Sequence, residues 1–349
     1  MIQELQKGET VAPATDILVR PPFALFLGDA ADQRYVKTAT GVLRWRPGEC
    51  VAQVSLPGCV ADVGLPEMDI ASAAAAGART LVIGLAPAGG SVPDSWKPTF
   101  AEALRHGLDI ASGMHSTLAD DPELAALAQA SGARILDLRA VKQVLPIGTG
   151  RKRTGKRLLA VGTDCGVGKM FATLALAQAM RGRGANADFR ATGQTGILIA
   201  GSGICIDAVV SDFIAGAAEW LSPDAAPDHW DVIEGQGSLF HPAYAGVTLG
   251  LLHGSQPDWL VICHDAGREM MVGFPGYAVP SVAECIEANL RAGRLVNPAV
   301  AVAGVCVNTS SMDEEAAALY MSDLEASLGI PVCDPLRTGV EAIVDRLGL

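Results

Sequence analysis

The sequence is poor in aromatic residues, in charged residues and in positive charge. Phe, Trp and Tyr make up 5% of its 349 residues, Asp, Glu, Lys and Arg together make up 18%, and the formal net charge is −12. Proteins that bind nucleic acids usually carry an excess of positive charge, so we expect no nucleic-acid partner. An acidic chain can still bind an anionic small molecule where a nest of backbone N–H groups supplies a positive field.

Cysteine pairs and long apolar runs are missing as well. The first 16 residues have mixed charges and no apolar core, which predicts no signal peptide. The apolar stretch over residues 70–87 is interrupted by Arg79 and by glycines, so we expect no membrane partner. We predict no metal ligands, and we expect reduced, mostly buried thiols in a cytoplasmic protein. The eight cysteines occur singly, without a CxxC motif, at Cys50, Cys59, Cys165, Cys205, Cys263, Cys285, Cys306 and Cys333.

Apolar, strand-like runs alternate with helical ones along the whole chain. Half of the residues are hydrophobic, and the length suits two domains. This alternation predicts an α/β fold with parallel sheets in both domains. The basic, glycine-containing segment 146–157 is predicted to be a solvated linker, which gives domains over 1–150 and 151–349. Strands are predicted at FALFLG, TLVIGLAP, DIASGM and RILDLR, and in the second domain at LLAVG, DVIEG, WLVICHD and AVAGVCVN.

The clearest motif is a phosphate-binding loop in the second domain. It follows the predicted strand 158–162 and opens a predicted helix over 169–182. Glycines let N–H groups converge on phosphate oxygens, the helix N-terminus adds a partial positive charge, and a lysine adds a full one. The predicted cofactor-binding residues are Gly162, Thr163, Asp164, Cys165, Gly166, Val167, Gly168, Lys169 and Met170.

Met170 stands where a loop of this kind normally has Ser or Thr. The hydroxyl of that residue holds Mg²⁺, and a thioether is no ligand for this ion. Binding of a diphosphate does not need the hydroxyl, whereas phosphoryl transfer largely does. The sequence therefore favours a phosphorylated cofactor that is bound without being cleaved at its phosphates.

Polar side chains follow other predicted strands, at the sheet edge where ligands sit in α/β proteins. Within DVIEGQGSLFHP, Glu234 and His241 are both candidates for a general base. The pKa of an ordinary imidazole favours His241, and the position at the strand end favours Glu234, so the choice stays open. Arg190 and Arg268 are candidates for binding a substrate carboxylate. Candidates for hydrogen bonds to a polar substrate are Thr192, Gln194 and Thr195.

Four segments, taken in order, resemble one bacterial protein family. They are VGTDCGVGKM, TGQTGILI, VIEGQGSLFHPAYAGVTLGLLHGSQP and VNTSSMDEEA with the later DPLRTG. The family combines a Rossmann-like N-terminal domain with a P-loop C-terminal domain and includes the D-glutamate N-acetyltransferase. The resemblance covers nearly the whole chain and implies an acyltransferase. It would transfer acetyl from acetyl-CoA to the amino group of an acidic amino acid, D-glutamate. We also expect a homo-oligomer.

A more distant similarity connects the chain with dethiobiotin synthetase. That enzyme has a GTD…VGK loop with Thr after the Lys, and an EG-x-G strand end where Glu234 lies here. The similarity implies an ATP- and Mg²⁺-dependent small-molecule ligase as the alternative, with Asn308 as a candidate for contacting adenine. Met170 favours the acetyltransferase, because acetyl-CoA carries a diphosphate and an adenine but transfers no phosphoryl group. A nucleotide-binding regulator without catalytic activity is the third hypothesis.

Overall fold

The structure is a computed structural model that describes residues 19–85, 90–141 and 144–349. The described chain forms two compact units. The first contains the described residues up to 141 and the segment Gln194–Ala208, and the second contains the remainder of 144–349. The predicted domain bounds ignore Gln194–Ala208, which belongs by its contacts to the first unit.

The first unit is built on a five-stranded parallel sheet in the order β2-β1-β3-β4-β5. This order is one of the two common doubly wound arrangements. The strand β1, which lies between β2 and β3, is buried at all six positions, as expected for a strand covered on both faces. The strands are β1 Phe23–Gly28, β2 Cys50–Ser55, β3 Thr80–Ile83, β4 Asp109–Ser112 and β5 Ile135–Asp137, and the helices are α1 Lys37–Trp45, α2 Ile70–Ala75, α3 Lys97–Arg105, α4 Pro122–Ser131 and α6 Gln194–Ala200.

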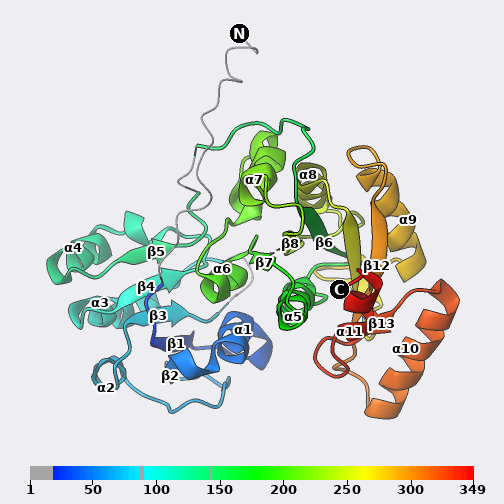
Figure 1. Cartoon of the computed structure of the whole chain (residues 1–349). Coiled ribbons are helices and arrows are strands. Elements are labelled where there is room, and N and C mark those ends of the chain that lie inside the picture. The colour runs from blue at the N-terminus through cyan, green and yellow to red at the C-terminus, as the bar shows by residue number, and fades with distance from the viewer. Residues whose placement is uncertain (1–18, 86–89, 142–143) are drawn as a thin grey trace, which may run out of the picture. The chain divides into compact units, whose positions relative to one another are not determined.

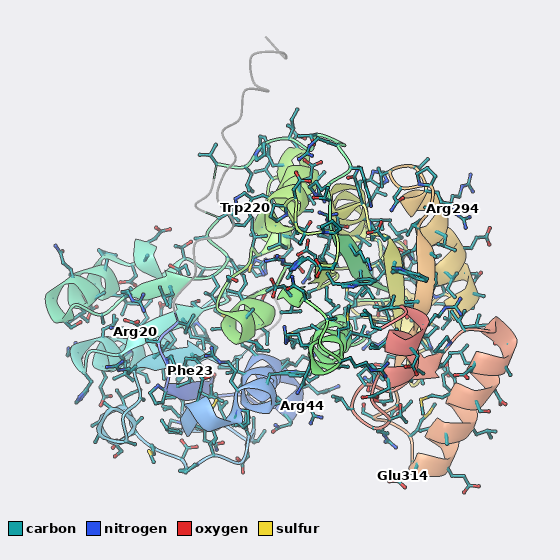
Figure 2. The ribbon with its side chains drawn as sticks, viewed as in Figure 1. Arg20, Phe23, Arg44, Trp220, Arg294 and Glu314 are labelled. Carbon is teal, nitrogen blue, oxygen red and sulfur yellow. The ribbon has the colours of Figure 1, made fainter. Side chains whose placement is uncertain are left out.

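An aromatic cluster and a buried carboxylate hold the first unit together. Phe26 of β1 packs edge-on against Trp96 and Phe100, with ring centroids 5.4 and 5.2 Å apart. Asp109, the first residue of β4, is fully buried and accepts hydrogen bonds from the guanidinium groups of Arg20 and Arg134. Figure 2 labels Arg20 and Phe23 in this unit. The carboxylate therefore ties together the amino-terminal ends of β1, β4 and β5.

The second unit is built on a six-stranded parallel sheet in the order β13-β12-β9-β6-β8-β7 (Figure 1). Its strands are β6 Lys156–Gly162, β7 Ala187–Arg190, β8 Trp230–Ile233, β9 Trp259–Asp265, β12 Ala301–Asn308 and β13 Val332–Cys333. A small antiparallel hairpin, β10 Met270–Met271 with β11 Phe274–Ala278, follows β9. The helices are α5 Lys169–Gly182, α7 Ile214–Leu221, α8 Ala245–Ser255, α9 Val282–Gly293, α10 Glu314–Leu328 and α11 Glu341–Arg346.

Helices cover the second sheet and supply its core. Buried side chains of α5 and α11 pack on β6, β8, β9 and β12 in one apolar cluster. α9 begins with a capping box, in which Ser281 and Glu284 satisfy each other's backbone N–H groups. Arg294 and Glu314, at the end of α9 and the start of α10, are exposed side chains (Figure 2). The predicted α/β fold with two parallel sheets is confirmed.

The basic segment before β6 is more than the solvated linker that the sequence predicts. Arg153 and Arg157 are 5% and 0% exposed. Arg153 donates to the carbonyl oxygens of Gly254 and Ser255 at the end of α8, and Arg157 donates to those of Ser222 and Pro223 after α7. Cations favour helix C-termini, where carbonyl groups lack partners, so these arginines anchor two helices.

Some predictions fall outside the described residues. The N-terminal segment lies within 1–18, and the last residues of the predicted strand TLVIGLAP lie within 86–89. In the described ranges, none of the helices is both long and apolar enough to cross a membrane. All eight cysteines are free thiols, six of them buried, with Cys59 and Cys165 partly exposed.

Candidate functional site

The loop between β6 and α5 has the geometry of a phosphate-binding loop. Gly166 and Gly168 adopt φ angles of 64° and 98°, the left-handed region that favours glycine. Within the part of the chain that the structure describes, the N–H groups of Gly166, Gly168 and Lys169 donate no hydrogen bond. These donors lie at the N-terminus of a 14-residue helix, so they are available to an anion.

Lys169 lies beneath this loop and is 6% exposed. Its Nζ donates to the carbonyl oxygen of Asp164 at 2.7 Å. Burial lowers the pKa of the ammonium, because the charged form loses its hydration. A bound anion would supply the missing counter-charge. The position and the environment of Lys169 therefore both suit phosphate binding.

Asp164 joins the loop to the segment after β9. The carboxylate is fully buried. Its Oδ1 accepts from the N–H of Cys165 at 2.6 Å, and its Oδ2 accepts from Arg268 and from the N–H of Val272, both at 2.9 Å. Arg268 also donates to the carbonyl oxygen of Cys165 and to Asp265. Thus Arg268 holds the loop from outside, and its guanidinium is engaged by two carboxylates.

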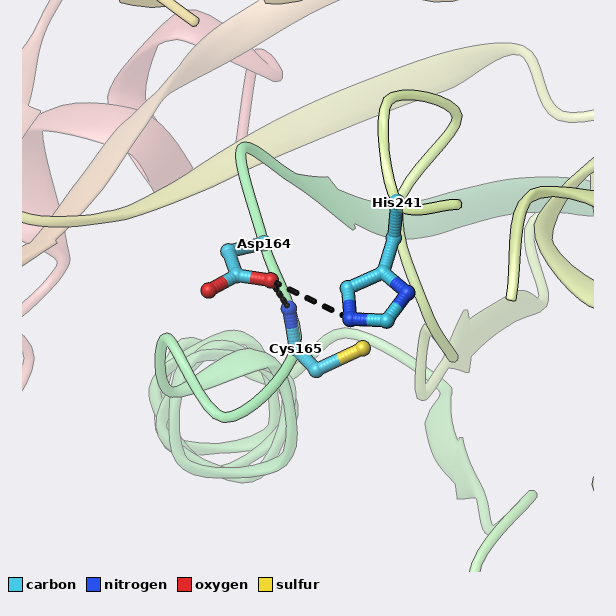
Figure 3. A group of neighbouring side chains, drawn as sticks. All are labelled: Asp164, Cys165 and His241. Carbon is cyan, nitrogen blue, oxygen red and sulfur yellow. Dashed lines mark hydrogen bonds and ion pairs between the residues drawn. The ribbon is translucent and has the colours of Figure 1, made fainter. Parts of the chain in front are cut away.

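Asp164, Cys165 and His241 lie close enough together to raise the question of a metal site (Figure 3). Their ligand atoms are all within 4.8 Å of one another. A nitrogen that binds a metal needs a free lone pair, but the hydrogen bonds of His241 place its proton on the nitrogen that faces the other two residues. Nδ1 accepts from the N–H of Ala243 at 3.2 Å, so Nε2, which faces the cluster, carries the proton. These residues do not fit a metal.

His241 is held by backbone on both sides of its ring. Nε2 lies 3.2 Å from the carbonyl oxygen of Val272, to which it donates, and 4.0 Å from Asp164 Oδ1. The side chain is 1% exposed and its ring stacks on that of Tyr244, with centroids 4.6 Å apart. To act as a base, His241 would have to release Ala243 from Nδ1. The contacts therefore suit a positioning role better than proton transfer.

Glu234 lies at the carboxyl end of β8 and holds the end of β7. Its Oε2 accepts from the N–H groups of Thr192 and Gly193 at 2.9 and 3.1 Å, and the Thr192 hydroxyl donates back to the Glu234 carbonyl oxygen at 2.7 Å. The side chain is 5% exposed. These hydrogen bonds hold the Glu234 carboxylate at the strand end.

The position after Glu234 must be glycine because a larger residue does not fit there. A Cβ on Gly235 would lie 1.7 Å from the carbonyl oxygen of Ala160 in β6 and 3.0 Å from Cδ of Lys169. The backbone that follows β8 therefore passes close to β6 at this position. It brings the Glu234 strand end beside the phosphate-loop lysine.

The predicted substrate-binding residues have different surroundings. Arg190 Nε donates to the buried Asp231 at 2.6 Å, and Asp231 is near the amino-terminal end of β8. Gln194 and Thr195 open α6 in the first unit, where Gln194 accepts from Arg139 and Thr195 donates to Thr38. Thr192 lies beside Glu234, as described above.

Asn308 ends β12, two strands from β6 in the sheet. Its side-chain oxygen accepts from the N–H of Ser310 at 3.1 Å, which leaves the amide N–H₂ to other partners. On β9, His264 pairs with Val307, the residue before Asn308, and its Nδ1 lies 3.0 Å from the hydroxyl of Thr163 in the phosphate loop. Burial lowers the pKa of His264. The sequence does not predict the contact of His264 with Thr163 or the backbone contacts of Val272, because both depend on residues that are far apart in the chain.

Comparisons with known proteins agree with this architecture. Residues 146–344 match the family described as a domain of unknown function, DUF1611_C, P-loop domain, and residues 54–141 match its Rossmann-like counterpart, DUF1611_N. The chain is 49% identical to proteins named D-glutamate N-acetyltransferase from Tritonibacter scottomollicae and from a Pseudoalteromonas species. The matches cover 95% and 94% of this chain and 99% of each relative. A crystal structure of a DUF1611 family protein from Anabaena variabilis is similar at a TM-score of 0.85 and 32% identity, over 94% of this chain and 99% of that one.

Proposed function

Because this chain belongs to the DUF1611 family and carries both of its domains, we propose that it is a D-glutamate N-acetyltransferase with acetyl-CoA as acetyl donor. The observation that carries the proposal is 49% identity, over almost the full length, to two proteins of that name. The Rossmann-like and P-loop domains agree with the resemblance seen in the sequence. The donor and the role of each residue are our own inference.

The phosphate loop supports a CoA ester as donor. Its unbonded N–H groups and the buried Lys169 suit the diphosphate of CoA, and Met170 offers no hydroxyl for Mg²⁺. We assign the diphosphate to residues 162–169, and we assign the adenine to the side of Asn308. The loop then serves as an anchor and takes no part in bond breaking.

The reaction needs a base and a counter-charge for the substrate. A base first takes one proton from the substrate ammonium. The amine nitrogen then attacks the thioester carbonyl, the C–N bond forms, the C–S bond breaks, and a second proton passes from the nitrogen to the leaving CoA thiolate. Glu234 and His241 are the candidates for the base, and their contacts favour Glu234. Thr192 would hydrogen-bond the substrate nearby.

An acidic substrate needs local cations in a chain with a net charge of −12. Arg268 is the better supported of the two proposed arginines because it lies against the loop, whereas Arg190 pairs with Asp231. Binding a carboxylate through Arg268 would require exchange with Asp164 or Asp265. The predicted substrate contacts of Gln194 and Thr195, the cytoplasmic location and the homo-oligomer stay predictions.

The test is an assay that separates the three hypotheses. The purified protein is incubated with acetyl-CoA or ATP and a panel of D- and L-amino acids, and free CoA, ADP and product mass are measured. We expect CoA release and an N-acetylated product with D-glutamate. ADP release that depends on Mg²⁺ and an acidic substrate, without CoA release, would identify the ATP-dependent ligase. Nucleotide binding without any turnover would identify the regulator.

A further inference from the structure

A continuous row of four aromatic rings lies next to the phosphate loop. The Tyr244 ring stacks on that of His241 with centroids 4.6 Å apart, Phe274 meets His241 edge-on at 5.0 Å, and Tyr277 meets Phe274 edge-on at 6.0 Å. The row joins the segment after β8 to the hairpin β10–β11. Its inner member, His241, lies beside Asp164 of the loop (Figure 3).

Hydrogen bonds fix this row to the loop. The backbone of Val272, in the hairpin turn, donates to Asp164 Oδ2 at 2.9 Å and accepts from His241 Nε2 at 3.2 Å. Arg268, just before the hairpin, donates to the carbonyl oxygen of Cys165. The row and the anion-binding N–H groups therefore form one connected assembly, held through the buried Asp164 carboxylate.

The outer members of the row are exposed, although the chain has few aromatic residues. Tyr244 and Tyr277 are 50% and 53% exposed, and the side chain of Val272 is 50% exposed. Clustered apolar side chains on a surface mark contacts with ligands or partners more often than scattered ones do. Tyrosine also offers a hydroxyl at its outer end, which suits a ligand that is mostly apolar but carries amide groups.

We infer that Tyr244, Val272 and Tyr277 form the binding surface for the pantetheine arm of acetyl-CoA, an inference that rests on the proposed function. The arm is a flexible, largely apolar chain with two amides that starts at the diphosphate. Asn308, to whose side we assign the adenine, ends β12, two strands from β6. The arm would leave the diphosphate toward the row, which joins the segment after β8 to the hairpin after β9.

The experiment compares two ligands that differ only by this arm. Dissociation constants for CoA and for adenosine 3′-phosphate 5′-diphosphate are measured by calorimetry on the full-length protein and on Tyr244→Ala and Tyr277→Ala. We expect CoA to bind the variants about tenfold more weakly and the nucleotide to bind unchanged. Leu295→Ala, which removes a side chain that is 76% exposed elsewhere in the same unit, should change neither constant.

Other results would overturn the inference in distinguishable ways. If the tyrosine variants lost the same affinity for CoA and for the nucleotide, the tyrosines would support the loop and would not contact the arm. Unchanged CoA binding together with a smaller particle in sedimentation would assign the surface to a second copy of the chain. If the wild-type protein bound CoA no more tightly than the nucleotide, the arm would contribute no affinity. The inference would then fail, while the assignment of the loop to the diphosphate would stand. If the wild-type protein bound neither ligand, the proposed function itself would fail.

Discussion

At the scale of single residues, Glu234 and His241 show what contacts add to a sequence argument. Ordinary pKa values favour a histidine as base. In the fold, Nε2 of His241 donates to Val272 and its unprotonated Nδ1 already accepts from Ala243, whereas the Glu234 carboxylate accepts from two backbone N–H groups at a strand end. The sequence could name both candidates but could not choose between them, since the choice depends on Ala243 and Val272.

We therefore expect Glu234→Gln to lower kcat by about 10²–10⁴-fold, the usual contribution of a general base. Glutamine keeps an oxygen for the N–H groups of Thr192 and Gly193, so the strand ends should stay in place. His241→Asn should retain the ascending limb of the pH dependence of kcat, and Glu234→Gln should lose it. A large loss in His241→Asn with a nearly normal Glu234→Gln would reverse the assignment.

At the scale of helices and strands, the long regular elements were predictable and the elements with weak propensity were not. β9, β12 and α5 begin and end where the sequence predicts. No helix is predicted for the glycine-rich segment TGQTGILI, but its residues from Gln194 onward belong to α6, because Ile197 and Leu198 are buried there and the Leu198 carbonyl oxygen accepts from Arg46. Tertiary contacts outweigh the low helix propensity of its threonine and glycine.

Asp109 gives a test of how the strands of the first unit are held together. Asp109→Asn removes the charge that Arg20 and Arg134 share, and we expect a loss of about 1–3 kcal/mol of stability. Burial opposes ionisation of this carboxyl, but the hydrogen bonds from the two arginines outweigh it and lower its pKa. The stabilisation by the ionised Asp109 carboxylate is therefore complete above pH ~4, near the pKa of an unfolded aspartate. It is lost as the pH falls through the lower pKa that Asp109 has in the folded state.

Melting temperatures of wild type and Asp109→Asn, measured from pH 7 downwards, check this expectation. The difference should be several degrees at neutral pH and should shrink below pH ~4. Asp94→Asn is the matched control, because the Asp94 side chain is 93% exposed and its ion pair with Lys97 should matter little. A difference that grows on acidification would contradict the account of Asp109.

At the scale of the whole molecule, the composition and the alternation of strand-like and helical runs were enough to predict two α/β domains. The order of the motifs was enough to predict the family. The sequence could not reveal that α6 returns to the first unit, because that depends on contacts of residues far apart in the chain. For the same reason it could not show that Asp164 connects the phosphate loop with the hairpin after β9. The site residues that lie within the loop motif were predictable, and those that reach it through backbone contacts were not.

The central claim is that the phosphate loop binds the donor CoA ester, and Lys169→Ala tests it most directly. Steady-state kinetics with acetyl-CoA and D-glutamate are compared for wild type, Lys169→Ala and the control Lys152→Ala, whose ammonium pairs with Asp258 near the start of β6. The loss of a charged hydrogen bond, worth about 1.5–3 kcal/mol, should raise KM for acetyl-CoA about 10–150-fold. The KM for D-glutamate should change little. An unchanged KM for acetyl-CoA in Lys169→Ala would contradict the assignment of the loop to the cofactor.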